Sequence, residues 1–307
     1  MVSPVSQRPR WTEAPPAPRF WRRSRSRLAA GTRLAAGVSL VTGYLSIIVL
    51  LPIAALVAHG FSLGVATKGW GPAFWHWHVH ADLGLFWSAV TQPAAISAIR
   101  LSLWLSLGVA AINAVMGVAI AWVLVRDRFF GRWAIEAVID LPFALPTIVV
   151  GVVLLSLYGV ASPVGINLFE TWLGLMVALL FVTLPFSVRA VQPVLASLDG
   201  EAEAAATSLG AGGLRTFCSV VLPSLWPAVL SGFGLAFARA VGEFGSISLI
   251  AGGIGRTTTA SAYIYGLTEG FLWSSAAAVS TALLLVSLAV LVSSNVLARR
   301  VQRRLAP

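Results

Sequence analysis

Six stretches of the sequence contain no charged residue and are long enough, or nearly so, to cross a bilayer as a helix. A helix needs about 20 predominantly apolar residues to span the hydrocarbon core. The six stretches are residues 38–58, 101–125, 141–160, 172–188, 220–238 and 272–298. Because a backbone in lipid must satisfy its own hydrogen bonds, they predict an all-α integral membrane protein with six transmembrane helices.

The composition excludes several other classes of protein. Hydrophobic residues make up 58% of the chain and charged residues only 10%, whereas soluble domains have about 45–50% apolar and about 25% charged residues. The single cysteine, Cys218, has no internal disulfide partner. The single lysine, Lys68, is followed by Gly69, whereas a phosphate-binding Walker A loop needs Lys followed by Ser or Thr. We therefore expect no nucleotide site, no cofactor and no enzymatic activity in this chain.

The positions of the basic residues predict the orientation. Of the 21 Lys and Arg residues, 17 fall before the first stretch, between the second and third, between the fourth and fifth, or after the sixth. Basic loops tend to remain in the cytoplasm, so both termini are expected there, in a bacterial plasma (inner) membrane. This distribution also explains the net charge of +10 without nucleic acid as a partner, since nucleic-acid binding needs a basic face on a soluble fold.

The segments outside the apolar stretches divide the chain into parts. Residues 1–37 are rich in Arg, Pro and Ser, which predicts a disordered basic arm near anionic lipid headgroups. Residues 38–298 are expected to form the six-span transmembrane domain, and residues 299–307 a basic cytoplasmic tail. In the loop after the first stretch, His76, His78 and His80 alternate with Trp75, Trp77 and Val79. A metal site there is the less favoured interpretation, because the tryptophans are typical of an aromatic belt at the membrane interface.

Residues 190–219 form the longest connection on the cytoplasmic side. The part from Glu201 to Ser208 is rich in alanine with acidic residues at its start, and Gly210, Gly212 and Gly213 follow. Alanine and glutamate favour a helix, an acidic first turn suits its dipole, and glycine ends it. A short cytoplasmic helix is therefore expected.

This connection resembles the EAA signature of bacterial ABC importer permeases of type I. The resemblance rests on Glu203, Ala204, Ala205 and Ala206, then Gly210, then Leu222 and Pro223. It implies that the short helix is a coupling helix, which docks on a separate ATPase subunit through these residues. Glu203 stands one residue further from Gly210 than in that family, and such an offset turns a helical side chain by about 100°. The contact made by Glu203 is therefore left open.

Three further segments are similar to the T-type subunit of the sulfate/thiosulfate permease branch. They are residues 140–151, residues 184–193, and residues 238–245 with the sequence Ala-Arg-Ala-Val-Gly-Glu-Phe-Gly. The resemblance covers about residues 40–300. It implies an importer with a paralogous second permease of W type, two ATP-binding subunits that hold ATP and magnesium, and an extracytoplasmic sulfate-binding protein.

Charged side chains near the outer ends of the stretches are candidates for the anion path. Arg239 and Glu243 have the i, i+4 spacing of neighbours on one helix face, and an anion path needs positive charge that is partly neutralised in lipid. They are expected at an outer gate, with a buried ion pair that fixes helix packing as the alternative. Arg100 is a weaker candidate, since a long side chain at a span end can reach the interface. Ser102, Ser106 and Asn113 are expected mainly to form hydrogen bonds between helices.

The sequence therefore predicts a membrane-spanning permease subunit that forms half of the path of an ATP-driven sulfate or thiosulfate importer. A molybdate or tungstate importer is the alternative in the same class, because the motif around Arg239 and Glu243 is close in both branches. An ion-coupled secondary transporter is less favoured, since it should carry intramembrane carboxylates or broken helices in paired halves. A membrane scaffold without transport is a third class.

Overall fold

The computed structural model describes residues 38–61, 83–198, 200–252 and 257–305. All regular elements in these ranges are helices, so the all-α prediction is confirmed. The basic arm and the histidines of the first loop lie outside the described residues. Contacts divide the chain into two units, Met1–Ala55 and Leu56–Pro307, and the first contributes only residues 38–55 to the description.

The elements follow one another along the chain as helices of very different length. In order they are η1 (Ser46–Leu50), α2 (Leu51–Phe61), α3 (Leu83–Val90), α4 (Pro93–Arg126), α5 (Arg132–Ala144), α6 (Thr147–Tyr158), α7 (Trp172–Ser197), α8 (Gly200–Ser208), α9 (Gly213–Thr216), η3 (Phe217–Val221), α10 (Leu222–Val241), α11 (Gly245–Ile250), α12 (Ala260–Glu269) and α13 (Trp273–Leu305).

Five helical stretches in the described residues are long and apolar enough to cross a membrane. They are Val38–Phe61, Pro93–Arg126, Trp172–Ser197, Gly213–Val241 and Trp273–Val301. Each matches one of the charge-free stretches of the sequence. A sixth span is present only if α5 and α6 count as one, because these two helices meet at an angle of 112°. The prediction of six spans thus holds for five continuous helices and one broken span.

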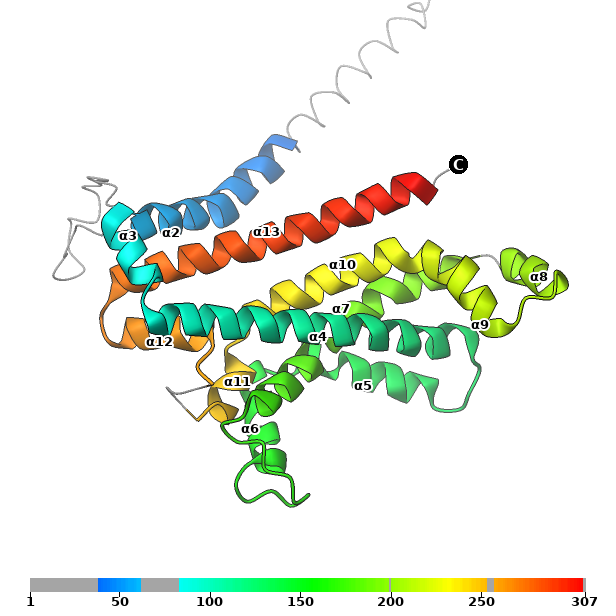
Figure 1. Ribbon diagram of the computed structural model, residues 1–307, viewed down its shortest axis with the longest axis horizontal. Helices are drawn as coiled ribbons and strands as arrows, with labels where there is room; N and C mark the ends of the chain where they lie inside the picture. Colours follow the sequence, from blue (N-terminus) through cyan, green and yellow to red (C-terminus); the bar gives the residue numbers. More distant parts are fainter. Residues whose placement is uncertain (1–37, 62–82, 199, 253–256, 306–307) are drawn as a thin grey trace, which may run out of the picture. The chain divides into compact units, whose positions relative to one another are not determined.

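The third span, predicted over residues 141–160, is broken into two helices and starts earlier than its charge-free stretch. The helix α5 begins earlier, at Arg132, and ends at Ala144. The helix α6 begins at Thr147, so two non-helical residues interrupt the span. Pro146 disfavours helical dihedral angles in the preceding residue, and Leu145 is extended with φ −89° and ψ 134°. Figure 1 shows α6 turning away from the direction of α4 and α10.

The helices also reach beyond the charge-free stretches, which shortens the predicted cytoplasmic connection. The helix α7 continues through Arg189 to Ser197, and the next long helical stretch begins at Gly213. The connection of residues 190–219 is therefore limited to residues 198–212, with α8 inside it. Figure 1 shows α8 and α9 at one end of the second unit, and α3 and α12 at the other.

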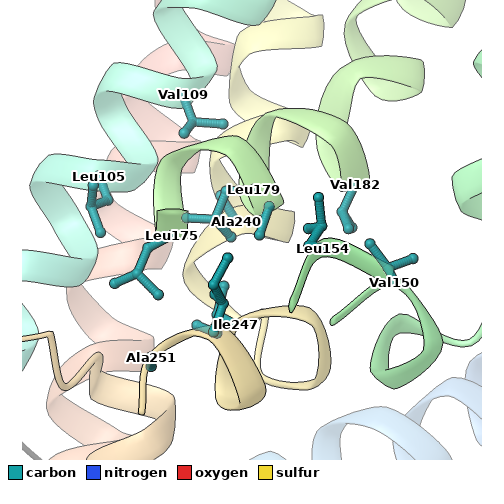
Figure 2. Packing of buried hydrophobic residues seen from close by; sticks show 12 residues of the cluster. Leu105, Val109, Val150, Leu154, Leu175, Leu179, Val182, Ala240, Ile247 and Ala251 are labelled. Atoms are coloured by element: carbon teal, nitrogen blue, oxygen red, sulfur yellow. The ribbon is translucent and has the colours of Figure 1, made fainter. Parts of the chain in front are cut away.

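Buried apolar side chains hold α4, α6, α7, α10 and α11 together. Figure 2 shows this cluster, to which α4 contributes Leu105 and Val109, α7 contributes Leu175 and Leu179, and α11 contributes Ile247. A second cluster joins α4, α7, η3 and α10 nearer to α8; it includes Ala121, Leu195, Val221 and Leu225. Many large apolar side chains on the outer faces remain exposed, as a lipid-facing surface requires.

Candidate functional site

The predicted coupling helix is α8, which carries acidic residues Glu201 and Glu203 in its first turn. It ends in a Schellman motif: Gly210 N–H donates to the carbonyl of Thr207 and Ala211 N–H donates to that of Ala206. Gly210 has φ +83°, a left-handed conformation that glycine adopts without steric cost. The left-handed end of α8 therefore explains why the sequence has glycine at position 210.

The tip that follows α8 presents two apolar side chains to solvent. Leu209 is 90% exposed and Leu214 is 80% exposed. Ala204 and Ala205 are exposed on α8 itself, and their small side chains allow a partner to approach closely. Small and apolar side chains are therefore exposed together on α8 and just after it.

Leu222 and Pro223 mark a change in helical winding after α9. Leu222 N–H donates to the carbonyl of Phe217, which closes the π turn of η3. Proline has no N–H and its ring clashes with the carbonyl four residues earlier, and a wider turn before Pro223 relieves that clash. The same pattern occurs before Pro52, where Leu51 N–H donates to the carbonyl of Ser46. The motif thus shapes the entry into α10.

Glu203 makes a contact within its own chain. Its carboxylate forms an ion pair with Arg126, the last residue of α4. In the sequence, Arg126 is one of the basic residues between the second and third apolar stretches, which indicate only the orientation of the chain. No spacing rule links it to Glu203, since the two residues are 77 positions apart.

A second group of charged residues joins α5 and α7, and the sequence argument missed it as a group. Arg189 donates to both carboxylate oxygens of Asp140, and its Nη1 donates to Gln192 Oε1 over 2.6 Å. Glu136 accepts from Arg132 over 3.1 Å and from Gln192 over 3.5 Å. Asp140, Arg189 and Gln192 all lie in segments that carry the family resemblance. That resemblance is the feature of the sequence that could have indicated this group. A pocket of about 650 Å³ lies beside the group, lined in part by Arg126, Arg132 and Arg189.

The predicted ion pair of Arg239 and Glu243 is present at the far end of α10. The helix ends at Val241, so Glu243 lies just beyond it and not on its face. Glu243 is only 2% exposed, and its Oε1 accepts a hydrogen bond from Ser246 N–H, at the start of α11, over 2.8 Å. Its carbonyl accepts from Ser261 Oγ, on α12, over 2.7 Å. Glu243 therefore joins three helices, while Arg239 remains about one-third exposed.

Arg100 is the third charged residue predicted for the path. It is exposed on α4 and lines an apolar groove of about 450 Å³ together with Leu103, Trp104 and Val286. Among the described residues, the ion pair of Glu243 is with Arg239, and none is recorded between Arg100 and Glu243.

The polar residues of α4 bond to other helices. Asn113 Nδ2 donates to Thr183 Oγ1 over 2.8 Å and to the carbonyl of Leu180 over 3.2 Å. Ser102 Oγ accepts from Ala260 N–H over 2.7 Å. The prediction of interhelical hydrogen bonds is confirmed for these two residues, while Ser106 Oγ is buried without a partner in the described structure. In the same residues, no three His, Cys, Asp or Glu side chains gather as a metal site would require.

Membrane-spanning helices, a broken span and a short exposed helix at one end of the bundle define a multi-pass membrane permease of the kind found in ABC importers. Residues 113–307 match the family model described as binding-protein-dependent transport system inner membrane component, and the chain belongs to this family. Membership implies a transporter subunit in the inner membrane that works with an ATPase and a periplasmic binding protein.

Individual proteins agree with this assignment. The chain is 38% identical over 269 residues to the sulfate transport system permease protein CysT of Escherichia coli (strain K12), covering 85% of this chain and 91% of that protein. It is 40% identical over 262 residues to CysT of Synechocystis sp., covering 83% and 85%. A chain in the crystal structure of a bacterial ABC transporter that imports alginate superposes with a TM-score of 0.68 at 17% identity, covering 92% of this chain and 99% of that chain. This last similarity supports the fold alone.

Proposed function

We propose that this chain is a permease subunit of a sulfate importer and forms half of its translocation path. The observation that carries the proposal is the identity of 38% and 40%, over more than four-fifths of the chain, to proteins named sulfate transport permeases. Thiosulfate is a further candidate substrate, since it resembles sulfate in size and charge.

The proposed assembly contains a paralogous second permease, two ATP-binding subunits and an extracytoplasmic sulfate-binding protein. In the described residues this chain offers one docking surface, formed by α8 and the exposed Leu209 and Leu214. One such surface suits one ATPase subunit, so a second permease would be needed to engage the second ATPase. ATP and magnesium belong to the ATPase in this proposal, and this chain performs no covalent chemistry and binds no cofactor.

The proposed orientation places α8 and both termini in the cytoplasm. The support is the distribution of Arg: Arg126, Arg128 and Arg132 lie around the end of α4, near the end of the bundle that carries α8, and four arginines lie within residues 299–304. Basic residues next to spans are retained on the cytoplasmic side.

The proposed mechanism is alternating access driven by the ATPase. Closure of the ATPase pair displaces α8, and the continuous helical stretch from Gly213 to Val241 carries the displacement across the membrane. The 20 residues of α10 alone span about 30 Å at 1.5 Å per residue. Arg239 would then sit near the outer opening to receive the anion, with Glu243 holding its orientation and Arg100 attracting anions nearby.

Uptake of radiolabelled sulfate tests the proposal. Cells that lack their own sulfate importer would receive the ATPase, the second permease and the binding protein, with or without this chain. We expect uptake that requires this chain and that thiosulfate, but not molybdate, inhibits. Molybdate as the sole strong competitor would favour the molybdate alternative, and persistent uptake without this chain would contradict the role in the path.

A further inference from the structure

The ion pair of Arg126 and Glu203 joins the end of α4 to the first turn of α8. Both side chains are about three-quarters buried, with 26% and 24% exposed. A partly buried pair is less screened by water and salt than a pair on the surface. This contact therefore fixes α8 against the bundle more firmly than a solvent-exposed pair would.

Exposure along α8 shows which face of the helix is turned toward the bundle. Glu203 and Ala206 are half-buried and three residues apart, whereas Glu201, Ala204, Ala205 and Ser208 are exposed. Residues three and four apart share a face of a helix. The exposed residues thus form the face available to an ATPase, and Glu203 belongs to the opposite face. The one-residue offset noted in the sequence accounts for this, since it turns the side chain by about 100°.

Aromatic contacts extend the connection from Arg126 into the core. The guanidinium of Arg126 lies 5.7 Å from the centre of the Trp122 ring, within the range of a cation–π interaction. Trp122 meets Phe217 edge-to-face with ring centres 5.3 Å apart. Both rings pack against the buried cluster that contains Ala121 and Leu225. The ends of α4, α8 and η3 are therefore tied together by one continuous set of contacts.

We infer that Arg126 is a positioning residue of energy coupling: it holds Glu203, so that a displacement of α8 is passed to α4. This inference rests on the proposed function. Glu203 then acts inside the chain and not as a direct contact to the ATPase. Further along α4, Asn113 bonds to Thr183 on α7, so the displacement also reaches the centre of the bundle.

The first test exchanges the two charges in the complete complex. Arg126→Glu and Glu203→Arg would be made singly and together, and sulfate uptake and ATP hydrolysis would be measured in proteoliposomes containing all subunits. Each single variant should lower uptake about tenfold, within the range expected for residues in contact, and raise the ATP consumed per sulfate. The exchanged pair should recover most of the uptake. Arg126→Glu combined with Glu201→Arg is the matched control and should not recover.

The second test uses neutral variants, because the exchanged pair loses the cation over Trp122. If the two residues act through each other, Arg126→Gln and Glu203→Gln together should reduce uptake no more than the worse single variant. Losses that multiply in the double variant would overturn the inference, as would release of the ATPase from the complex by Glu203→Gln alone. If the unaltered complex takes up no sulfate, the proposed substrate is wrong. The effects of the same single and double variants are then measured on the ATPase rate of the complex, which requires no knowledge of the anion.

Discussion

Asp140 on α5 and Arg189 on α7 face each other with both carboxylate oxygens bound by one guanidinium. Arg189 Nε donates to Oδ1 over 2.9 Å, and Nη2 donates to Oδ2. The side chain of Arg189 is 36% exposed and that of Asp140 is 43% exposed, and exposed pairs contribute only about 0.2–1 kcal/mol to stability. The planar two-point contact nevertheless fixes the orientation of α5 against α7, one turn before the break between α5 and α6.

Arg189→Lys should therefore impair transport more than stability. Lysine keeps the charge but cannot make the forked contact. We expect sulfate uptake to fall severalfold. The free energy of unfolding of the purified complex, measured by thermal denaturation, should change by less than about 1 kcal/mol. Arg128→Lys is the matched control, since Arg128 is exposed on the adjoining loop and should tolerate the change. Normal uptake by Arg189→Lys would show that the fork has no role in transport.

Gly210 should tolerate asparagine but not valine. Its φ of +83° is costly for other residues, by about 1–2 kcal/mol, and asparagine is among the least penalised. No atom lies within 4 Å of a Cβ built at this position, so any loss arises from backbone strain at the end of α8. We expect Gly210→Val to lower uptake strongly and Gly210→Asn to retain most of it. Gly212→Ala, at φ −67°, should behave as the unaltered chain, and equal losses at both positions would contradict this explanation.

Gly151 should not accept alanine, because α6 and α11 touch there through their backbones. A Cβ at Gly151 would lie 3.0 Å from the carbonyl oxygens of both Gly245 and Ser246. Overpacking of this kind costs about 1–3 kcal/mol, so the thermal midpoint of the complex and its uptake should both fall.

Gly108 on α4 supplies the control for that substitution. No atom lies within 4 Å of a Cβ at this position, and alanine is favoured over glycine inside a helix by about 1 kcal/mol. Gly108→Ala should leave stability unchanged or raise it. If Gly151→Ala and Gly108→Ala proved equally stable, the close approach of α6 and α11 would not be a constraint on the fold.

Local features made the spans and the short helix α8 predictable from the sequence. Absence of charge located five continuous spans, and alanine with a following glycine located α8 and its end at Gly210. Asn113 was expected to bond between helices because lipid offers an amide no other partner. Each of these inferences uses residues that are close together in the sequence, or the fact that lipid forms no hydrogen bonds.

The break of the third span and the contact of Glu203 needed the structure. Ala144, Leu145 and Pro146 continue an apolar stretch, and hydropathy reports how apolar a segment is but not its direction. Pro146 was recognisable as a helix-breaking residue, yet the 112° angle depends on α6 packing against α11 through Gly151. Likewise, the pairing of Glu203 with Arg126 depends on where α4 ends relative to α8. Tertiary packing sets both.

Removal of Arg239 should destabilise the protein more than removal of the whole ion pair. Glu243 is almost fully buried, and a buried charge that loses its partner costs about 3–5 kcal/mol. Among the described residues, Arg239→Ala leaves that carboxylate with Ser246 N–H as its one recorded partner. Adding Glu243→Gln removes the charge and retains an acceptor for Ser246, so the double variant should denature at a higher temperature than Arg239→Ala.

Sulfate uptake then separates the two roles of Arg239. Recovery of uptake together with stability indicates a packing role, whereas a stable double variant that still fails to transport indicates a direct role in the outer gate. A double variant less stable than Arg239→Ala would contradict the cost assigned to the buried, unpaired carboxylate of Glu243.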